Sequence, residues 1–213
     1  RTNATPFQIS TLSNLTCGAD INLELTLNTS SHGSFVIPFV LHAGSPASVP
    51  LRFDVNALTN VSANGTIEST NVVAGFTGQL MKVGVSLWLT HPVAYLVDLA
   101  LVSPDGLVID LSSGHGLGAD FGTNCSPDAA RTTFDDFAAT PIFAGSPPFV
   151  GTYRPDASLA ALNFTTANGN WRLRIANFHI APGLLHCWTL FLYPPECAPG
   201  AGACDTCLAP ITN

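Results

Sequence analysis

Apolar residues in this chain alternate with polar ones or form short β-branched runs. The odd positions from Val83 to Leu89 are aliphatic, whereas Lys82, Gly84 and Ser86 lie between them, which is the pattern of a half-buried strand. The 18 glycines and 16 prolines interrupt the chain every few residues, so helical periodicity is nearly absent. We therefore predict an all-β fold, with strands at residues 21–27, 34–41, 51–55, 65–73, 79–89, 95–102, 107–111, 131–134, 169–177 and 184–193.

Glycine and proline also mark the connections between these strands. The tetrapeptide Ser-Pro-Asp-Gly at 103–106 predicts a tight turn, because proline fixes one φ angle and glycine tolerates a positive one. The glycine-rich stretch 112–122, which contains His115 and Asp120, is interpreted as a long loop. It is not expected to bind phosphate, because no helix follows it to receive an anion.

Charge and hydropathy exclude two classes of partner. Only 10% of residues are charged, the formal net charge is -7, and Lys82 is the single lysine. Nucleic acid is excluded because phosphate binding needs clustered lysine and arginine. The apolar runs are all shorter than the roughly 20 residues of a bilayer-spanning helix, so we expect no membrane span. Arg1 begins the chain without a signal sequence, and we expect any secretion signal to have been removed or to lie outside this sequence.

Cysteines and sequons indicate an extracellular or cell-surface location. Six cysteines allow 15 pairings, and zinc is the alternative for the Cys204 to Cys207 spacing. Disulfides are favoured, because no second close pair of ligands accompanies that spacing. Seven N-x-S/T triplets predict N-linked glycans. The cysteines are Cys17, Cys125, Cys187, Cys197, Cys204 and Cys207, and the sequons begin at Asn3, Asn14, Asn28, Asn60, Asn64, Asn124 and Asn163.

An ordered series of short motifs from about Ser69 to Tyr193 resembles the P domain, also called the Homo B domain, of subtilisin-like proprotein convertases. The motifs are S-T-N-V-V-A-G-F-T-G at 69–78, V-S-L-W-L-T-H-P at 85–92, V-D-L-A-L-V-S-P-D-G at 97–106, T-T-F-D-D-F-A at 132–138, P-F-V-G-T-Y-R-P at 148–155, N-G-N-W-R-L-R-I at 168–175 and G-L-L-H-C-W-T-L at 183–190. The chain departs from the family pattern at Leu96, where an aspartate is usual, and at 179–183, where H-I-A-P-G replaces G-D-x-G.

The resemblance implies a jelly-roll β-sandwich of two antiparallel sheets. Trp171 and Trp188 lie within alternating strands, so their side chains can fill the space between the sheets. The expected organisation is an arm or linker at 1–13, a β segment at 14–68 that packs on or completes the sandwich, the P-domain-like jelly roll at 69–193, and a Cys/Pro/Gly-rich linker at 194–213.

Two kinds of site residue follow from the resemblance. Some P domains of secreted bacterial proteases carry calcium, whose carboxylate ligands would here be Asp98, Asp135 and Asp136, with Asp105 and Asp120 as weaker additions; exposed loop carboxylates are the alternative. Cys125 and Cys187 both lie in the matched region, and we predict that they pair. The other four cysteines would then cross-link the flanking segments.

The sequence predicts no catalytic activity. Ser-Gly-His-Gly-Leu-Gly at 113–118 is superficially similar to the subtilisin histidine motif, but no G-T-S nucleophile segment follows. His115 is interpreted as a loop residue. His91, which has a counterpart in the family, is interpreted as structural.

Three functions remain possible at this level. The favoured one is a glycosylated building block of a surface layer, fibre or tandem-repeat protein, whose partners are neighbouring copies or domains joined by strand addition. The second is an accessory, stabilising or substrate-binding P domain of a larger secreted protease. The third is a sugar-binding module, for which Trp88, Tyr95 and Tyr153 are the candidate aromatic platform.

Overall fold

The computed structural model describes residues 15–197, which fall into two compact units. One unit runs from Val49 to Pro194, and the other combines residues up to Ser48 with those from Pro195 onward. The chain therefore passes between the units twice, at 48–49 and at 194–195. None of the described helices is long and apolar enough to cross a membrane.

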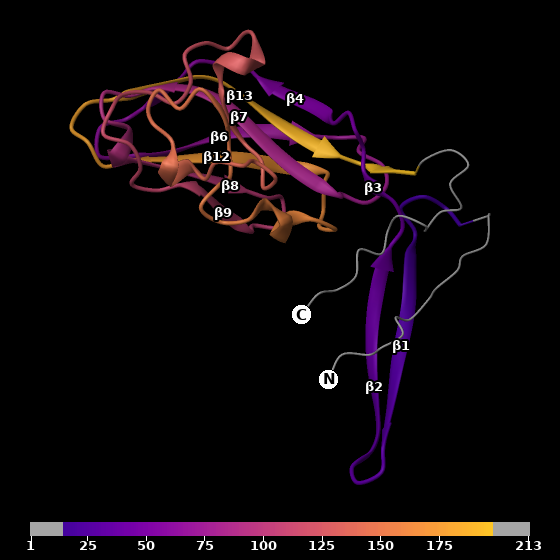
Figure 1. Cartoon of the computed structure of the whole chain (residues 1–213). Coiled ribbons are helices and arrows are strands. Elements are labelled where there is room, and N and C mark those ends of the chain that lie inside the picture. The colour runs from indigo at the N-terminus through magenta and orange to yellow at the C-terminus, as the bar shows by residue number, and fades with distance from the viewer. Residues whose placement is uncertain (1–14, 198–213) are drawn as a thin grey trace. The chain divides into compact units, whose positions relative to one another are not determined.

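The larger unit is a sandwich of two β-sheets (Figure 1). The first sheet has the strand order β11-β10-β7-β13-β4, and β5 also pairs with β13. The second has the order β6-β12-β8-β9. The strands are β4 (Leu51–Val55), β5 (Thr59–Val61), β6 (Thr66–Val73), β7 (Lys82–Thr90), β8 (Val97–Val102), β9 (Val108–Ser112), β10 (Thr132–Phe134), β11 (Gly151–Tyr153), β12 (Gly169–Asn177) and β13 (Gly183–Tyr193).

Short 3-10 helices lie in the connections of the sandwich. They are η1 (Ala94–Leu96), η2 (Asp128–Ala130), η3 (Ile142–Ala144) and η4 (Leu159–Leu162). Each is a single turn, in keeping with the poorer hydrogen-bond geometry of longer 3-10 runs. All the long elements of the sandwich are therefore β-strands.

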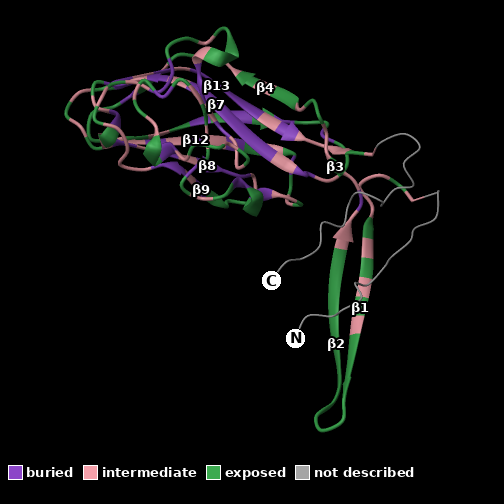
Figure 2. Ribbon diagram, in the orientation of Figure 1, coloured by how far each residue is buried: buried purple, intermediate pink, exposed green. Residues whose placement is uncertain are grey.

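The inner faces of the two sheets bury one hydrophobic core, seen as the purple strands of Figure 2. Trp171 on β12 and Trp188 on β13 are both fully buried. Each indole N–H has an acceptor: Nε1 of Trp171 donates to the carbonyl of Ala167 at 2.7 Å, and Nε1 of Trp188 donates to Oγ of Ser69 at 2.9 Å. Satisfying these donors removes the free-energy cost of burying polar atoms.

The smaller unit contains a long hairpin and a short ladder. Strand β1 (Asp20–Thr29) pairs antiparallel with β2 (Gly33–His42) in an unbroken register, and β3 (Ser45–Pro46) pairs with β14 (Pro195–Glu196). A disulfide between Cys17 and Cys197 joins the two ends of this unit. It closes a sequence separation of 180 residues.

The predicted all-β sandwich is confirmed, and two details differ from the expectation. β10 and β11 run parallel within the otherwise antiparallel first sheet. The segment 14–68 is divided between the units: β4, β5 and the start of β6 join the sandwich, whereas β1 and β2 pair only with each other. A three-residue connection links Thr29 to Gly33, so β1 and β2 form their ladder hydrogen bonds with each other.

Candidate functional site

The loop that resembles the protease histidine motif is held onto the sandwich by two aspartates. Oγ of Ser113 donates to both carboxylate oxygens of Asp110, at 2.9 and 3.0 Å. Nε2 of His115 lies 2.8 Å from Oδ2 of Asp156, which also accepts the backbone N–H of Ser113. The serine hydroxyl and the imidazole therefore contact different carboxylates, and their hydrogen bonds fix the loop.

Two of the five candidate calcium ligands accept several hydrogen bonds from protein donors. Asp135 accepts from Nζ of Lys82 at 2.7 Å and from the backbone N–H of Phe137 at 2.9 Å. The carboxylate of Asp136 accepts the backbone N–H groups of two η4 residues and the hydroxyl of Ser158. Ser158 is the N-cap residue of that short helix, and Asp136 adds a second acceptor for the N–H groups of its first turn.

The other three candidates lie in separate places. Asp120 accepts the backbone N–H of His91, and Asp105 accepts that of Thr166. Asp98 lies on β8 near Ser113. Between residues 15 and 197 no three acidic, histidine or cysteine side chains are arranged to hold a metal ion. The five aspartates therefore do not converge on one point within the described residues.

Asp98 instead shares its surroundings with an aspartate that the sequence pattern had not singled out. Asp110 lies on the adjacent strand β9, where it pairs with Ala100 of β8. Burial raises the pKa of the Asp98 carboxyl, and the charge of Asp110 raises it further. A polar residue inside the apolar run 107–111 was the available signal for Asp110, but sequence alone does not show which strand lies beside it.

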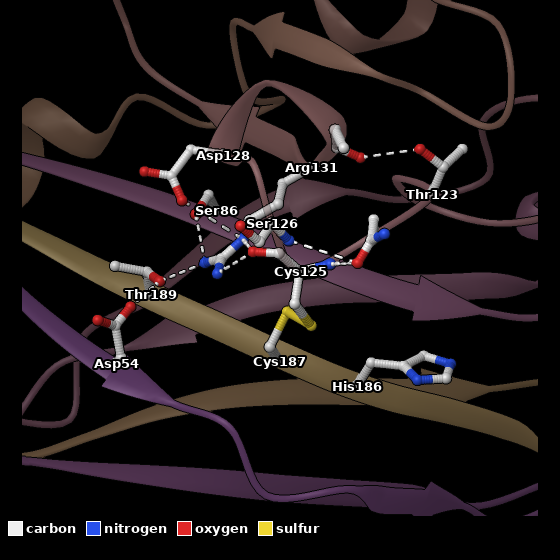
Figure 3. The surroundings of a disulfide bond; sticks show 12 residues. Asp54, Ser86, Thr123, Cys125, Ser126, Asp128, Arg131, His186, Cys187 and Thr189 are labelled. Carbon is white, nitrogen blue, oxygen red and sulfur yellow. Dashed lines mark hydrogen bonds and ion pairs between the residues drawn. A yellow bond between two sulfur atoms is a disulfide. The ribbon is translucent and has the colours of Figure 1, made fainter.

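A buried guanidinium organises the surroundings of the second disulfide (Figure 3). Cys125 and Cys187, the pair that the resemblance implied, are joined in the structure. Arg131 is only 4% exposed. Its Nε donates to the carbonyl of Cys125 at 2.8 Å, and its Nη1 donates to Oγ1 of Thr189 on β13. The disulfide and the arginine therefore tie the same loop to the same strand.

The network continues outward to acidic residues at the sheet surface. The Thr189 hydroxyl donates to Asp54 on β4, and Arg52 forms ion pairs with both Asp54 and Asp128. The hydrogen bond from Arg52 holds the pKa of Asp128 below its ordinary value. Burial lowers the pKa of Arg131, although a guanidinium stays protonated at neutral pH. Each charge in the network thus has an opposite charge or a hydrogen-bond partner nearby.

His91, the histidine with a counterpart in the family, has both ring nitrogens occupied. The backbone N–H of Val93 donates to Nδ1 at 3.1 Å, and Nε2 lies 3.0 Å from Oδ1 of Asn177. Because the amide nitrogen of Asn177 donates to two carbonyl groups, its Oδ1 is an acceptor and Nε2 of His91 carries the proton. The residue is 2% exposed, and its hydrogen bonds connect the segment after β7 to the end of β12.

A shallow hollow of about 270 Å³ lies on the outer side of the first sheet. The ring of Tyr193 lies at one edge, 4.7 Å from Nζ of Lys82, which is itself paired with Asp135. Arg52 lies over the ring of Phe191, 5.6 Å from its centroid. The hollow is lined by Pro50, Gly84, Asp128, Ala129, Thr133, Phe134, Asp135, Gly151, Thr152, Phe191 and Tyr193. It is slightly smaller than typical small-molecule sites.

The three aromatic residues proposed as a sugar platform make separate contacts. Trp88 stacks on His186 with 3.6 Å between ring centroids. Tyr153 packs edge-on against Phe149, and Tyr95 is half exposed in η1. A flat platform needs rings that share one surface, so the structure gives this hypothesis no support from these three residues.

The remaining predicted site residues are sequons and cysteines. Asn28, Asn60, Asn64 and Asn124 are exposed, whereas Asn163 is half-buried with its Oδ1 buried. Asn3, Asn14, Cys204 and Cys207 lie outside the described residues, as do the expected arm 1–13 and most of the expected linker 194–213.

Comparison with known proteins gives a weak structural similarity. No protein-family model and no curated relative matches the chain. The serine protease of Aeromonas sobria in complex with the chaperone ORF2 shows 13% identity and a TM-score of 0.39, over 81% of this chain and 36% of that one. The serine protease of Aeromonas sobria alone shows 15% identity and a TM-score of 0.33, over 80% and 36%. The chain thus spans about a third of these proteins, and TM-scores below 0.5 do not establish a shared fold.

Proposed function

We propose that this chain is a non-catalytic extracellular accessory module of a larger secreted protein. One observation carries the proposal: the polar residues in the P-domain-like motifs form hydrogen bonds within the framework of the sandwich. His91 and Asn177 bond to each other in the buried region, and Ser103, 1% exposed, closes the S-P-D-G turn by accepting the N–H of Leu107. Residues used in this way stabilise a scaffold, which supports a non-catalytic role.

The motif resemblance favours a subtilisin-like protease as the setting of the module. Two disulfides between distant parts of the chain support an oxidising, extracellular location. Within such a protease the sandwich would stabilise the catalytic domain or contact its substrate. This role needs a rigid framework, which the buried Arg131 network and the Cys125–Cys187 disulfide supply.

Peptide mapping of the native secreted protein tests this proposal. We expect peptides of this chain to occur in one polypeptide with a subtilisin-like catalytic domain. If the native polypeptide carries only further β-sandwich or repeat domains, the protease setting is refuted and the second candidate below stands.

The second candidate is a building block of a surface assembly, fibre or tandem-repeat protein. The observation that favours it is the β1–β2 hairpin, where large apolar side chains such as Phe35, Ile37 and Phe39 are 41 to 51% exposed. Exposed apolar residues in a contiguous set are typical of surfaces that contact another protein.

A further inference from the structure

The β1–β2 hairpin has one face with four consecutive rows of apolar side chains. Directly opposed residues of an antiparallel pair project to the same face, and that face alternates along each strand. The register pairs Ile21 with Leu41 and continues with every second residue. Four consecutive cross-strand rows of this face are apolar, Ile21/Leu41, Leu23/Phe39, Leu25/Ile37 and Leu27/Phe35, and the row Thr29/Gly33 follows at the tip.

The opposite face of the hairpin is different in character. Along β1 it presents Asn22, Glu24 and Thr26, all exposed. Across from them on β2 lie Val36, Pro38 and Val40. The hairpin thus has one apolar face and one mixed face. The mixed face is polar along β1 and apolar along β2. A sheet with one apolar face needs a second layer packed against that face.

Half of the apolar face is exposed in the described part of the smaller unit, and its other members, Ile21, Leu23, Leu25 and Leu41, are half-buried. Strands β1 and β2 pair only with each other, and β3 pairs only with β14. Four members of the face, Leu27, Phe35, Ile37 and Phe39, are 41 to 51% exposed. A two-stranded hairpin alone is marginally stable in water and needs a second apolar surface against it.

We propose that this face packs against the same face of a second copy of the chain, as a two-fold symmetric pair of hairpins. This inference goes beyond the accessory role and does not depend on either candidate function. The partner is a second copy because the face is self-complementary in shape, free of charge and large enough for a weak dimer.

The order of the rows makes the face self-complementary in side-chain size. A two-fold axis through the middle of the face places the Leu27/Phe35 row over the Ile21/Leu41 row of the partner. It also places the Leu23/Phe39 row over the Leu25/Ile37 row. Each row that contains a phenylalanine thus meets a row that contains only aliphatic residues, which lets large and small side chains interdigitate.

Charge and area agree with this pairing. The eight side chains of the face are leucine, isoleucine and phenylalanine, so no like charges meet across the interface. Glu24 lies on the opposite face, and the Asn28 sequon lies there too, so a glycan at Asn28 leaves the apolar face open. The ten-residue ladder is about 34 Å long, and two such faces would bury roughly 1,000 Å², near the lower limit for a specific interface.

The β2 edge of the hairpin is less suited to strand addition than its apolar face is to packing. Pro38 lies in the middle of β2, and proline has no N–H to donate to an added strand. Face-to-face pairing about a two-fold axis uses the same surface of both copies, so association stops at the dimer. Strand addition between copies uses two different surfaces and can continue as an open polymer. The proposal therefore predicts a dimer that does not grow.

Sedimentation velocity of the full chain over a wide concentration range tests the proposal. We expect a reversible monomer–dimer equilibrium with a dissociation constant on the order of 10 to 100 µM. Ile37→Glu, which places a charge in the apolar face, should weaken the dimer by at least about tenfold. Leu27→Glu, in the outermost row, should have an effect in the same direction.

Val36→Glu is the matched control. Val36 is adjacent to Ile37, similarly exposed at 55% against 47%, and on the opposite face, so this variant should dimerise within about twofold of the original chain. The backbone amide NMR signals of β1 and β2, recorded for every variant, show whether a substitution has unfolded the hairpin.

Three results would overturn the proposal. The original chain could remain monomeric at all concentrations, which would mean that the larger unit or another domain covers the face. Val36→Glu could weaken the dimer as much as Ile37→Glu does. The chain could also form open polymers. None of these results bears on the peptide map that tests the accessory role.

Discussion

The carboxyl of Asp98 is more easily protonated in the folded protein than in the unfolded chain, because burial and then the charge of Asp110 raise its pKa. The folded state therefore binds more protons than the unfolded state at pH values between the unfolded pKa, about 3.9, and the raised folded pKa. The contribution of Asp98 to the free energy of unfolding is therefore most favourable below that window, and this contribution is lost as the pH rises through the window.

Asp98→Asn should therefore raise the melting temperature at pH 7 by about 2 °C and have little effect near pH 3. The asparagine keeps an acceptor oxygen but carries no charge to be disfavoured. Differential scanning calorimetry between pH 3 and 8 measures this. Asp105→Asn, in the exposed turn, is the control. A variant less stable than the original chain at pH 7 would show that the charge of Asp98 is needed.

Arg131 should contribute to stability through its buried hydrogen bonds. Arg131→Met leaves the Cys125 carbonyl and the Thr189 hydroxyl without their donor, so we expect a loss of about 2 kcal/mol in the free energy of unfolding. Urea denaturation measures it. Arg154→Met removes an exposed arginine that makes one long hydrogen bond, 3.4 Å to a carbonyl, and should change stability by less than about 0.5 kcal/mol. Equal effects of the two substitutions would refute the role of the buried network.

The sequence indicated some of these residues better than others. Trp171 and Trp188 were predicted in the core because they lie in alternating strands. Arg131 was placed in a strand but not recognised as buried, because arginine is rarely buried and its partner Thr189 on β13 lies 58 positions away. The five candidate calcium ligands were chosen by residue type, and the fold gives each of them a different set of donors.

At the scale of elements, the Cys125–Cys187 disulfide cross-links the loop before β10 to the central strand β13. Replacing both cysteines with alanine should lower the stability of the sandwich by about 3 kcal/mol, because the unfolded chain gains freedom. The matched control replaces Cys17 and Cys197, which lie in the smaller unit, and should leave the melting temperature of the sandwich unchanged. A larger loss from the control pair would contradict the division into two units.

Strand prediction succeeded where alternation was long and failed where elements were short. β7, β8, β12 and β13 lie where the pattern placed them. β11, with only three residues, leaves no detectable periodicity, and its parallel pairing depends on residues 19 positions from β10. The hairpin strands were predicted, but their separation from β4 and β5 depends on long-range pairing with β13 that no local signal records.

At the scale of the whole molecule, the candidate calcium ligands accept hydrogen bonds from different protein donors. We expect the melting temperature to be the same with and without a chelator, because the carboxylates of Asp135 and Asp136 are already satisfied by protein donors. Calorimetry on protein freed of metal and then resupplied with calcium measures this. A rise of several degrees on adding calcium would show that an ion binds the folded chain.

The account of the whole molecule depends on the claim that its polar motifs build a scaffold and perform no reaction. The most direct test is treatment of the purified chain with a fluorophosphonate that labels reactive serines, followed by intact mass measurement and a peptide-hydrolysis assay. We predict an unchanged mass and no hydrolysis. A single adduct on one serine, lost together with hydrolytic activity when that serine is replaced, would contradict the claim.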